Sequence, residues 1–127
     1  CGYIAAVFSI LGHMFPIYFK FRGGKGVATA LGVTTALAWQ TFPIVMIPFV
    51  IIVAVSKMIS LGSIISAVIL PIATYFVYYF WYPECSPVVP TVATAVIALL
   101  IIFMHRTNIK RMVRGEENKL GAKKSDE

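Results

Sequence analysis

Long apolar runs separated by short polar segments dominate the sequence. A helix needs roughly 20 mostly apolar residues to cross a bilayer, so the apolar stretch 27–56 is too long for one upright helix. We divide it near Pro43, because proline disfavours a continuous helix. The pattern predicts an all-α polytopic membrane protein, with residues 1–127 forming a single transmembrane domain. The five predicted membrane-spanning helices lie at about 1–19, 27–40, 43–56, 61–82 and 88–104, and a cytoplasmic tail follows at 105–127.

The composition supports lipid as the main solvent. The chain is 59% hydrophobic and 13% charged, whereas a soluble domain is nearer half apolar and about a quarter charged. The formal net charge is +6, which in a soluble protein would suggest nucleic acid. Here the basic residues flank apolar runs, so we expect membrane lipids and anionic ligands as partners and no nucleic acid. The chain opens at Cys1 inside an apolar run without the features of a signal peptide, so we expect it to be N-terminally truncated.

The charges also predict the topology. Five alternating helices place the loops 20–25 and 57–60 and the tail on one face of the membrane, and all 11 Lys and Arg residues lie there. The loops near 40–43 and 83–90 lie on the other face, with Glu84 and an aromatic belt. Because basic residues concentrate on the cytoplasmic side, the first face is predicted to be cytoplasmic.

A glycine-rich loop on this face is the first candidate site. Glycines let a backbone turn tightly and bring its N–H groups close to a ligand, and the following helix directs its positive N-terminus to the same place. This chemistry favours an oxyanion, most naturally phosphate. The alternative is an ordinary basic loop with flexible glycines. The segment reads Phe21-Arg22-Gly23-Gly24-Lys25-Gly26-Val27-Ala28-Thr29.

The second candidate site begins where the last span ends. If that span continues as a helix, His105, Asn108 and Arg111 lie on one side of it, with Gly115 and Glu117 beyond. An imidazole, a carboxamide and a guanidinium together can orient a hydroxyl, donate to an oxyanion and hold a phosphate. The alternative is a basic juxtamembrane helix that binds anionic lipid.

Three further polar residues fall on the same predicted face. His13 would lie at membrane depth, where an ionisable side chain is a functional candidate, although it could equally cap a helix kinked at Pro16. Ser60 and Ser63 begin a span, where serines are usually helix caps. The two cysteines have no metal-ligand spacing, and we expect no metal site.

Two motifs together carry a resemblance to a known family. Gly12-His13-Met14-Phe15-Pro16, running on to the glycine-rich loop, resembles the central motif of the bacterial acyl-phosphate:glycerol-3-phosphate acyltransferases. His105-x-x-Asn108-x-x-Arg111, with Gly115, Glu117 and Lys119, resembles their C-terminal motif. The resemblance covers essentially the whole chain, and Ser60-Leu61-Gly62-Ser63 lies between the motifs. The family's first motif, a Gly/Asn-rich loop after its first helix, is absent from this chain.

The resemblance implies the C-terminal portion of a seven-helix enzyme in the bacterial inner membrane. Such an enzyme transfers a fatty acyl group from acyl phosphate to glycerol 3-phosphate, giving lysophosphatidic acid and phosphate, without a cofactor. It further implies catalytic roles for Lys25, His105 and Asn108. The substrate-binding residues implied with them are His13, Arg22, Gly23, Gly24, Gly26, Thr29, Ser60, Ser63, Arg111 and Glu117. A transporter of an organic phosphate is the alternative, but transporters bind near the bilayer midplane and not at one face.

Overall fold

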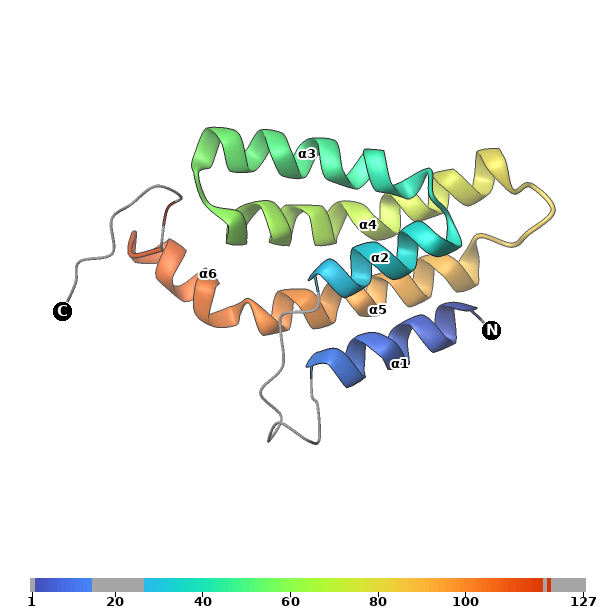
Figure 1. Ribbon diagram of the computed structural model, residues 1–127, viewed down its shortest axis with the longest axis horizontal. Helices are drawn as coiled ribbons and strands as arrows, with labels where there is room; N and C mark the ends of the chain where they lie inside the picture. The colour runs from blue at the N-terminus through green and yellow to red at the C-terminus, as the bar shows by residue number, and fades with distance from the viewer. Residues whose placement is uncertain (1, 15–26, 118, 120–127) are drawn as a thin grey trace.

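The computed structural model describes residues 2–14, 27–117 and 119, and every regular element within them is a helix (Figure 1). The prediction of an all-α fold is therefore confirmed for this part of the chain. The helices are α1 (Gly2–Met14), α2 (Val27–Leu37), α3 (Thr41–Ser56), α4 (Ile59–Trp81), α5 (Val88–Met104) and α6 (Arg106–Val113).

Helix α4 is at the centre of the bundle and packs between α3 and α5. Helix α1 contacts α2 and α5, and α2 also contacts α3. Successive helices from α1 to α5 run in alternating directions (Figure 1). The α3–α4 connection and α6 therefore lie at one end of the bundle, which we call the α6 end. The α2–α3 and α4–α5 connections lie at the opposite end.

Small side chains allow the helices to approach closely. The buried core is built from the residues Ile10, Ala30, Val45, Ala67, Leu70, Ala73, Ile97, Ala98 and Ile101. Gly62 lies at a close contact between α3 and α4, since a Cβ atom added there would lie 2.7 Å from Val53 Cγ2 and 3.1 Å from Phe49 Cδ2. Small residues of this kind are typical of helix contacts in membranes. At Gly62 the close contact fixes the first turns of α4 against α3.

Three buried threonines inside the bundle are satisfied within their own helices. The hydroxyls of Thr34, Thr74 and Thr94 donate to the carbonyl oxygens four residues earlier, at 2.7, 2.8 and 2.9 Å. Such bonds hide a hydroxyl from an apolar environment without a partner on another helix. Outward-facing apolar side chains, by contrast, remain exposed along the helices; examples are Phe8, Ile47, Val55, Phe80 and Leu99.

The described helices differ in whether they are long enough to span a membrane. Helix α4 has 23 residues, which corresponds to a length of about 35 Å. Among the described residues it is the one helix that is by itself long enough and apolar enough to cross a membrane. Helices α5 and α6 are long and apolar enough only when they are taken together, as a pair bent by 56°. Helices α1, α2 and α3 are apolar but shorter. The prediction of five spans therefore remains a prediction.

Several predicted boundaries are corrected. Helix α2 ends at Leu37 and not at 40, and α3 begins at Thr41 rather than at Pro43. Pro43 lies in the first turn of α3, where a missing N–H breaks no helical hydrogen bond. Helix α4 covers 59–81 in place of the predicted 61–82, whereas α5 has the predicted bounds 88–104. The predicted span 1–19 begins as α1, and its residues after Met14 lie outside the described residues.

The segment predicted as a cytoplasmic tail at 105–127 begins with a helix. Its first residues fold into α6, and His105 and Asn108 are only 2% and 3% exposed. The helical conformation resumes after the last span, but the chain bends by 56° between α5 and α6. A helix that leaves the axis of α5 can lie across the end of the bundle, so its inward face becomes part of the protein core.

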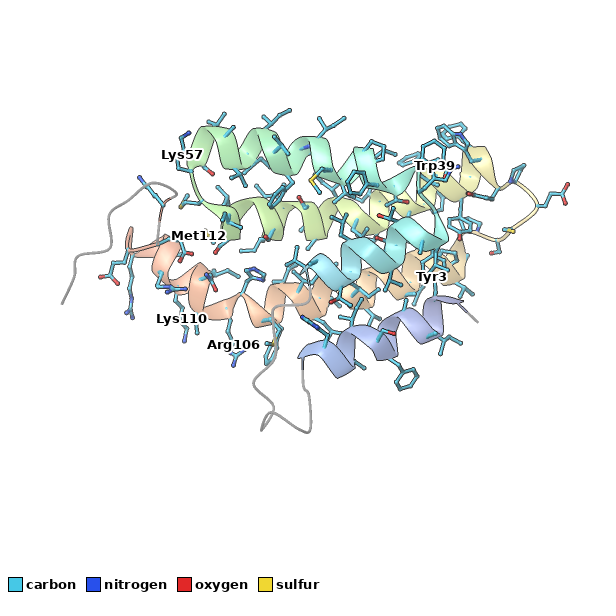
Figure 2. The ribbon with its side chains drawn as sticks, viewed as in Figure 1. Tyr3, Trp39, Lys57, Arg106, Lys110 and Met112 are labelled. Carbon is cyan, nitrogen blue, oxygen red and sulfur yellow. The ribbon has the colours of Figure 1, made fainter. Side chains whose placement is uncertain are left out.

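Aromatic side chains mark the opposite end of the bundle. Trp39 is well exposed there (Figure 2), as is Trp81 at the end of α4. The hydroxyl of Tyr82 donates to Gln40 Oε1 at 3.3 Å, which joins the two connections. Tyrosine and tryptophan are favoured where apolar and aqueous surroundings meet. This end therefore has the composition of a membrane–water interface, with the basic residues of α6 far from it.

Candidate active site

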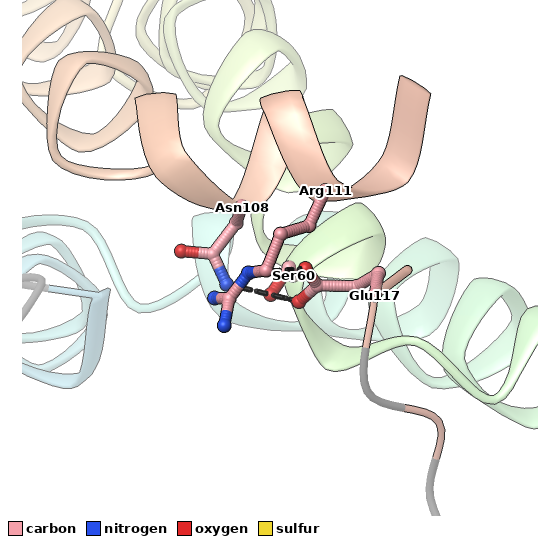
Figure 3. A network of polar contacts seen from close by, with 4 residues as sticks. All are labelled: Ser60, Asn108, Arg111 and Glu117. Carbon is pink, nitrogen blue, oxygen red and sulfur yellow. Dashed lines mark hydrogen bonds and ion pairs between the residues drawn. The ribbon is translucent and has the colours of Figure 1, made fainter. Parts of the chain in front are cut away.

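A buried polar network joins α4, α6 and the residues after α6 (Figure 3). Ser60 lies in the first turn of α4, Asn108 and Arg111 lie one turn apart on α6, and Glu117 follows that helix. The Ser60 hydroxyl donates to Glu117 Oε1 at 2.7 Å. Asn108 Nδ2 donates to Ser60 Oγ at 2.8 Å and to Glu117 Oε1 at 2.9 Å. Arg111 Nε lies 3.2 Å from Glu117 Oε2.

The carboxylate of Glu117 organises this network. Its side chain is 5% exposed, and an ionised carboxylate can only accept hydrogen bonds. Asn108 must therefore present its NH₂ group to Glu117 and direct its carbonyl oxygen away, as Figure 3 shows. Ser60 in turn must donate to the carboxylate and accept from Asn108. One charged acceptor thus sets the orientation of two neutral side chains.

A glycine at the end of α6 brings Glu117 into place. Gly115 has a φ of 73°, a left-handed conformation that glycine adopts without steric cost. Its N–H bonds to Met112 O at 3.1 Å, and the N–H of Glu116 bonds to Arg111 O at 2.8 Å. This pair of bonds is the Schellman motif, which ends a helix and reverses the chain. The reversal directs Glu117 back toward the inward face of α6.

His105 occupies the bend between α5 and α6. Its ring is buried, and Nδ1 lies 2.8 Å from the carbonyl oxygen of Ile101. Because a carbonyl oxygen only accepts, Nδ1 carries the proton, and in the neutral imidazole Nε2 does not. The bond restrains the ring one turn before Asn108. The bend thus places His105 at the edge of the same polar region.

The remaining predicted site residues are separate from this network or lie outside the described residues. Ser63 is buried one turn after Ser60, Thr29 is half-buried on α2, and His13 is exposed in the last turn of α1. The alternative that Ser60 is a helix cap is not supported, because Met58 is the N-cap of α4 and no side chain caps it. The residues outside the described ranges are Arg22, Gly23, Gly24, Lys25 and Gly26.

An apolar cavity of about 80 Å³ lies directly beneath the polar network, among α2, α3, α4 and α5. Ser63 lines it one turn after Ser60, and Ile101 lines it one turn before His105. A single water needs only about 10–15 Å³ by this measure, so a short alkyl segment fits. Ser66, which the sequence analysis did not single out, also lines the cavity, and its buried hydroxyl has no hydrogen-bond partner among the described residues. Its three-residue spacing from Ser63 was the available signal.

The donor set at this end of the bundle suits an anion and a hydroxyl. The described residues contain no group of three His, Cys, Asp or Glu side chains that could hold a metal ion. What they do bring together is a guanidinium, a carboxamide, an imidazole and a hydroxyl above an apolar cavity. The fold and site therefore define a helical membrane protein whose polar site lies at one end of the bundle and can receive an amphipathic molecule.

Sequence comparison identifies the family. Residues 1–115 match the model of the glycerol-3-phosphate acyltransferase family, and the chain belongs to that family. The glycerol-3-phosphate acyltransferase of Actinobacillus succinogenes is 36% identical over 137 aligned positions, which cover 99% of this chain and 64% of that protein. The glycerol-3-phosphate acyltransferase of Shouchella clausii is 40% identical over 120 aligned positions, which cover 94% of this chain and 57% of that protein. The family expected from the two motifs is therefore confirmed.

Two crystal structures of PlsY, an integral membrane glycerol 3-phosphate acyltransferase, have a similar fold. The glycerol 3-phosphate form is 37% identical with a TM-score of 0.73, covering 89% of this chain and 53% of that one. The lysophosphatidic acid form is 32% identical with a TM-score of 0.74, and the match covers 94% of this chain and 67% of that one. The chain spans a little over half to about two thirds of the length of the curated relatives named above.

Proposed function

We propose that the protein containing this chain transfers a fatty acyl group from acyl phosphate to glycerol 3-phosphate, giving lysophosphatidic acid and phosphate. The observation that carries the proposal is the network of Ser60, Asn108, Arg111 and Glu117 directly above an apolar cavity. Family membership and the two ligand-bound forms of the similar PlsY structures support it. The chain would form five spans of a single transmembrane domain in the bacterial inner membrane, with the α6 end facing the cytoplasm.

Both substrates carry a phosphate, and we assign their binding to the α6 end. Arg111 pairs with Glu117 through Nε, and a guanidinium has two further nitrogens that can donate to a phosphate. Its side chain is 42% exposed, which leaves the group accessible to a ligand from water. Lys25, Arg22 and the glycine-rich loop would supply the other phosphate contacts, with His13, Thr29 and the described serines around them.

The chemical step needs no nucleophile from the protein. A glycerol hydroxyl attacks the carbonyl carbon of acyl phosphate and forms the new ester bond. The bond between that carbon and the phosphate oxygen breaks, and the departing phosphate takes the bonding electrons and the hydroxyl proton. Asn108 directs its carbonyl oxygen away from Glu117, and a carbonyl has two lone pairs, so it can accept the attacking hydroxyl. His105 would orient the reacting groups, and Lys25 would stabilise the phosphate.

The cavity beneath the network would receive the first methylene groups of the acyl chain. Its lining is mainly apolar, from Val27 on α2 to Ile101 on α5, and Ser63 contributes a hydroxyl to it. Placing the acyl carbonyl at the boundary between this cavity and the polar network brings it to Asn108 and Ser60. The division of the site into a polar and an apolar half matches a donor with a charged head and an alkyl tail.

A donor assay with the full-length enzyme tests this function. Purified protein is incubated with labelled glycerol 3-phosphate and either acyl phosphate or acyl-CoA, and lysophosphatidic acid is quantified. We expect product only from acyl phosphate, and its loss in Asn108→Leu, which removes both amide contacts while keeping the branching at Cγ. Product from acyl-CoA alone would contradict the proposal. Product from neither donor with folded protein would favour an organic-phosphate transporter.

A further inference from the structure

Helix α6 presents two chemically different faces. Its inward face holds the buried Asn108, and Arg111 reaches from it toward Glu117. Arg106, Lys110 and, at the C-terminal cap, Arg114 are all exposed. At about 100° per residue, these three cations at four-residue spacing fall within roughly 80° of the helix circumference. Figure 2 shows Arg106 and Lys110 on the side of α6 away from α4.

Within the described part of the chain, these three outward cations have no acidic partner. Among the residues that the structure describes, the ion pair found is Arg111 with Glu117. No described carboxylate lies within 4.0 Å of the three outward cations. Arg106 is held in place instead by Phe103, since its guanidinium lies 4.4 Å from the centre of that ring and Nη1 donates to Phe103 O at 3.1 Å. The guanidinium is thus positioned yet still exposed.

An apolar surface leads directly to this cationic stripe. Leu99 and Phe103, one turn apart near the end of α5, are 68% and 55% exposed, and Val113 on α6 is 83% exposed. On a helix that spans a membrane, exposed apolar side chains can pack against lipid tails. The cations begin where the apolar surface of α5 ends, which is where the phosphates of a leaflet lie relative to its acyl chains. The order of apolar and cationic groups therefore matches that of a phospholipid.

We propose that the outward face of α6, formed by Arg106, Lys110 and Arg114, binds the head groups of anionic phospholipids. The acyl chains of such a lipid would lie against Leu99 and Phe103, and its phosphate would lie among the three cations. Near an anionic leaflet each Lys or Arg contributes about 1 kcal/mol, which is roughly fivefold in local lipid concentration. This surface is separate from the proposed acyl-transfer site, because Asn108 and Arg111 face the other way.

Local lipid enrichment beside α6 tests the proposal in the full-length protein. Val113→Cys, in a background that lacks other cysteines, is labelled with a fluorophore and reconstituted in phosphatidylcholine vesicles. Equal small amounts of spin-labelled phosphatidylglycerol or spin-labelled phosphatidylcholine are then compared as quenchers. We expect stronger quenching by phosphatidylglycerol, and loss of that preference in the triple variant Arg106→Gln, Lys110→Gln, Arg114→Gln. Acyl transfer in detergent should stay within about twofold, which separates this test from the proposed function.

Matched variants distinguish a specific surface from a general charge effect. Lys110→Gln should lower the preference about fivefold, whereas Lys57→Gln, which removes the same charge across the α6 end, should leave it unchanged (Figure 2). Arg106→Lys should retain it. Equal effects of Lys57→Gln and Lys110→Gln, or a preference that survives the triple variant, would overturn the proposal. So would displacement of the lipid by inorganic phosphate but not by chloride at equal ionic strength, since that result indicates a site for soluble anions.

Discussion

Replacing Glu117 with Gln removes one charge from the polar network and changes almost nothing in shape. In the native network both contacts to Oε1 come from donors, the Ser60 hydroxyl and Asn108 Nδ2, and Oε2 faces a third donor, Arg111 Nε. A glutamine amide has one oxygen and one NH₂ group, so it cannot accept from all three. In one orientation the glutamine NH₂ group faces Arg111, so two donors oppose each other. In the other orientation the NH₂ group faces Ser60 and Asn108, and the Asn108 amide must rotate to present an acceptor.

The magnitude follows from the contacts that lose their charge. A hydrogen bond to a charged group is worth about 1.5–3 kcal/mol, and a neutral one about 0.5–1.5. Two bonds to Oε1 therefore lose roughly 2–3 kcal/mol together. The Arg111 contact adds at most about 1 kcal/mol, because that side chain is 42% exposed and its charge is screened by water. The sum, about 3 kcal/mol, corresponds to roughly a hundredfold if it falls entirely on the transition state.

Acyl-transfer kinetics and thermal unfolding should be measured together for Glu117→Gln. We expect kcat/KM to fall ten- to hundredfold, with the rest of the free energy appearing as a lower unfolding temperature. Glu116→Gln is the matched control, because Glu116 is the adjacent residue and is exposed. The double variant Ser60→Ala, Glu117→Gln should be less harmful than the two single changes combined, since they remove the same bond. Wild-type kinetics and stability in Glu117→Gln, or strict additivity with Ser60→Ala, would refute the reasoning.

Three further predictions concern the geometry around the site. Gly115→Ala should reduce activity and stability, because its φ of 73° costs an alanine about 1 kcal/mol and Glu117 follows that turn; unchanged kinetics would contradict this. Lys57 also has a positive φ, 60°, so Lys57→Gly should be about 1 kcal/mol more stable than Lys57→Ala in thermal unfolding, both lacking the charge. Cys85 is exposed at the opposite end and should react with an impermeant maleimide in intact cells, whereas Lys110→Cys in a Cys85→Ser background should react only after permeabilisation; the reverse pattern would invert the topology.

The apolar pattern alone was enough for the fold class and for most of the helices. Helix α5 has the predicted bounds because a continuous apolar run ends at a charged one, and solvent preference decides that boundary locally. The predicted helix start at Pro43 lies two residues from the observed start of α3 at Thr41. This boundary is also set locally, because proline lacks the N–H group that a helix interior needs. The ends of α2 and α4 differ from the prediction by one to three residues, because packing and turn geometry decide where a helix ends.

The roles of the individual residues between 105 and 117 could be assigned only from the tertiary structure. From the sequence, this segment could be a catalytic helix or a basic helix bound to lipid, since both need His, Asn, Arg and Lys near a membrane surface. The bend at His105 turns α6 across the bundle, so Asn108 becomes buried against Ser60, 48 residues earlier, while Lys110 stays exposed. Contacts between residues so far apart in the sequence depend on helix packing, which local pattern does not encode. The sequence thus determined which chemical groups lie at this end of the membrane protein, and packing alone decided which of them face inward.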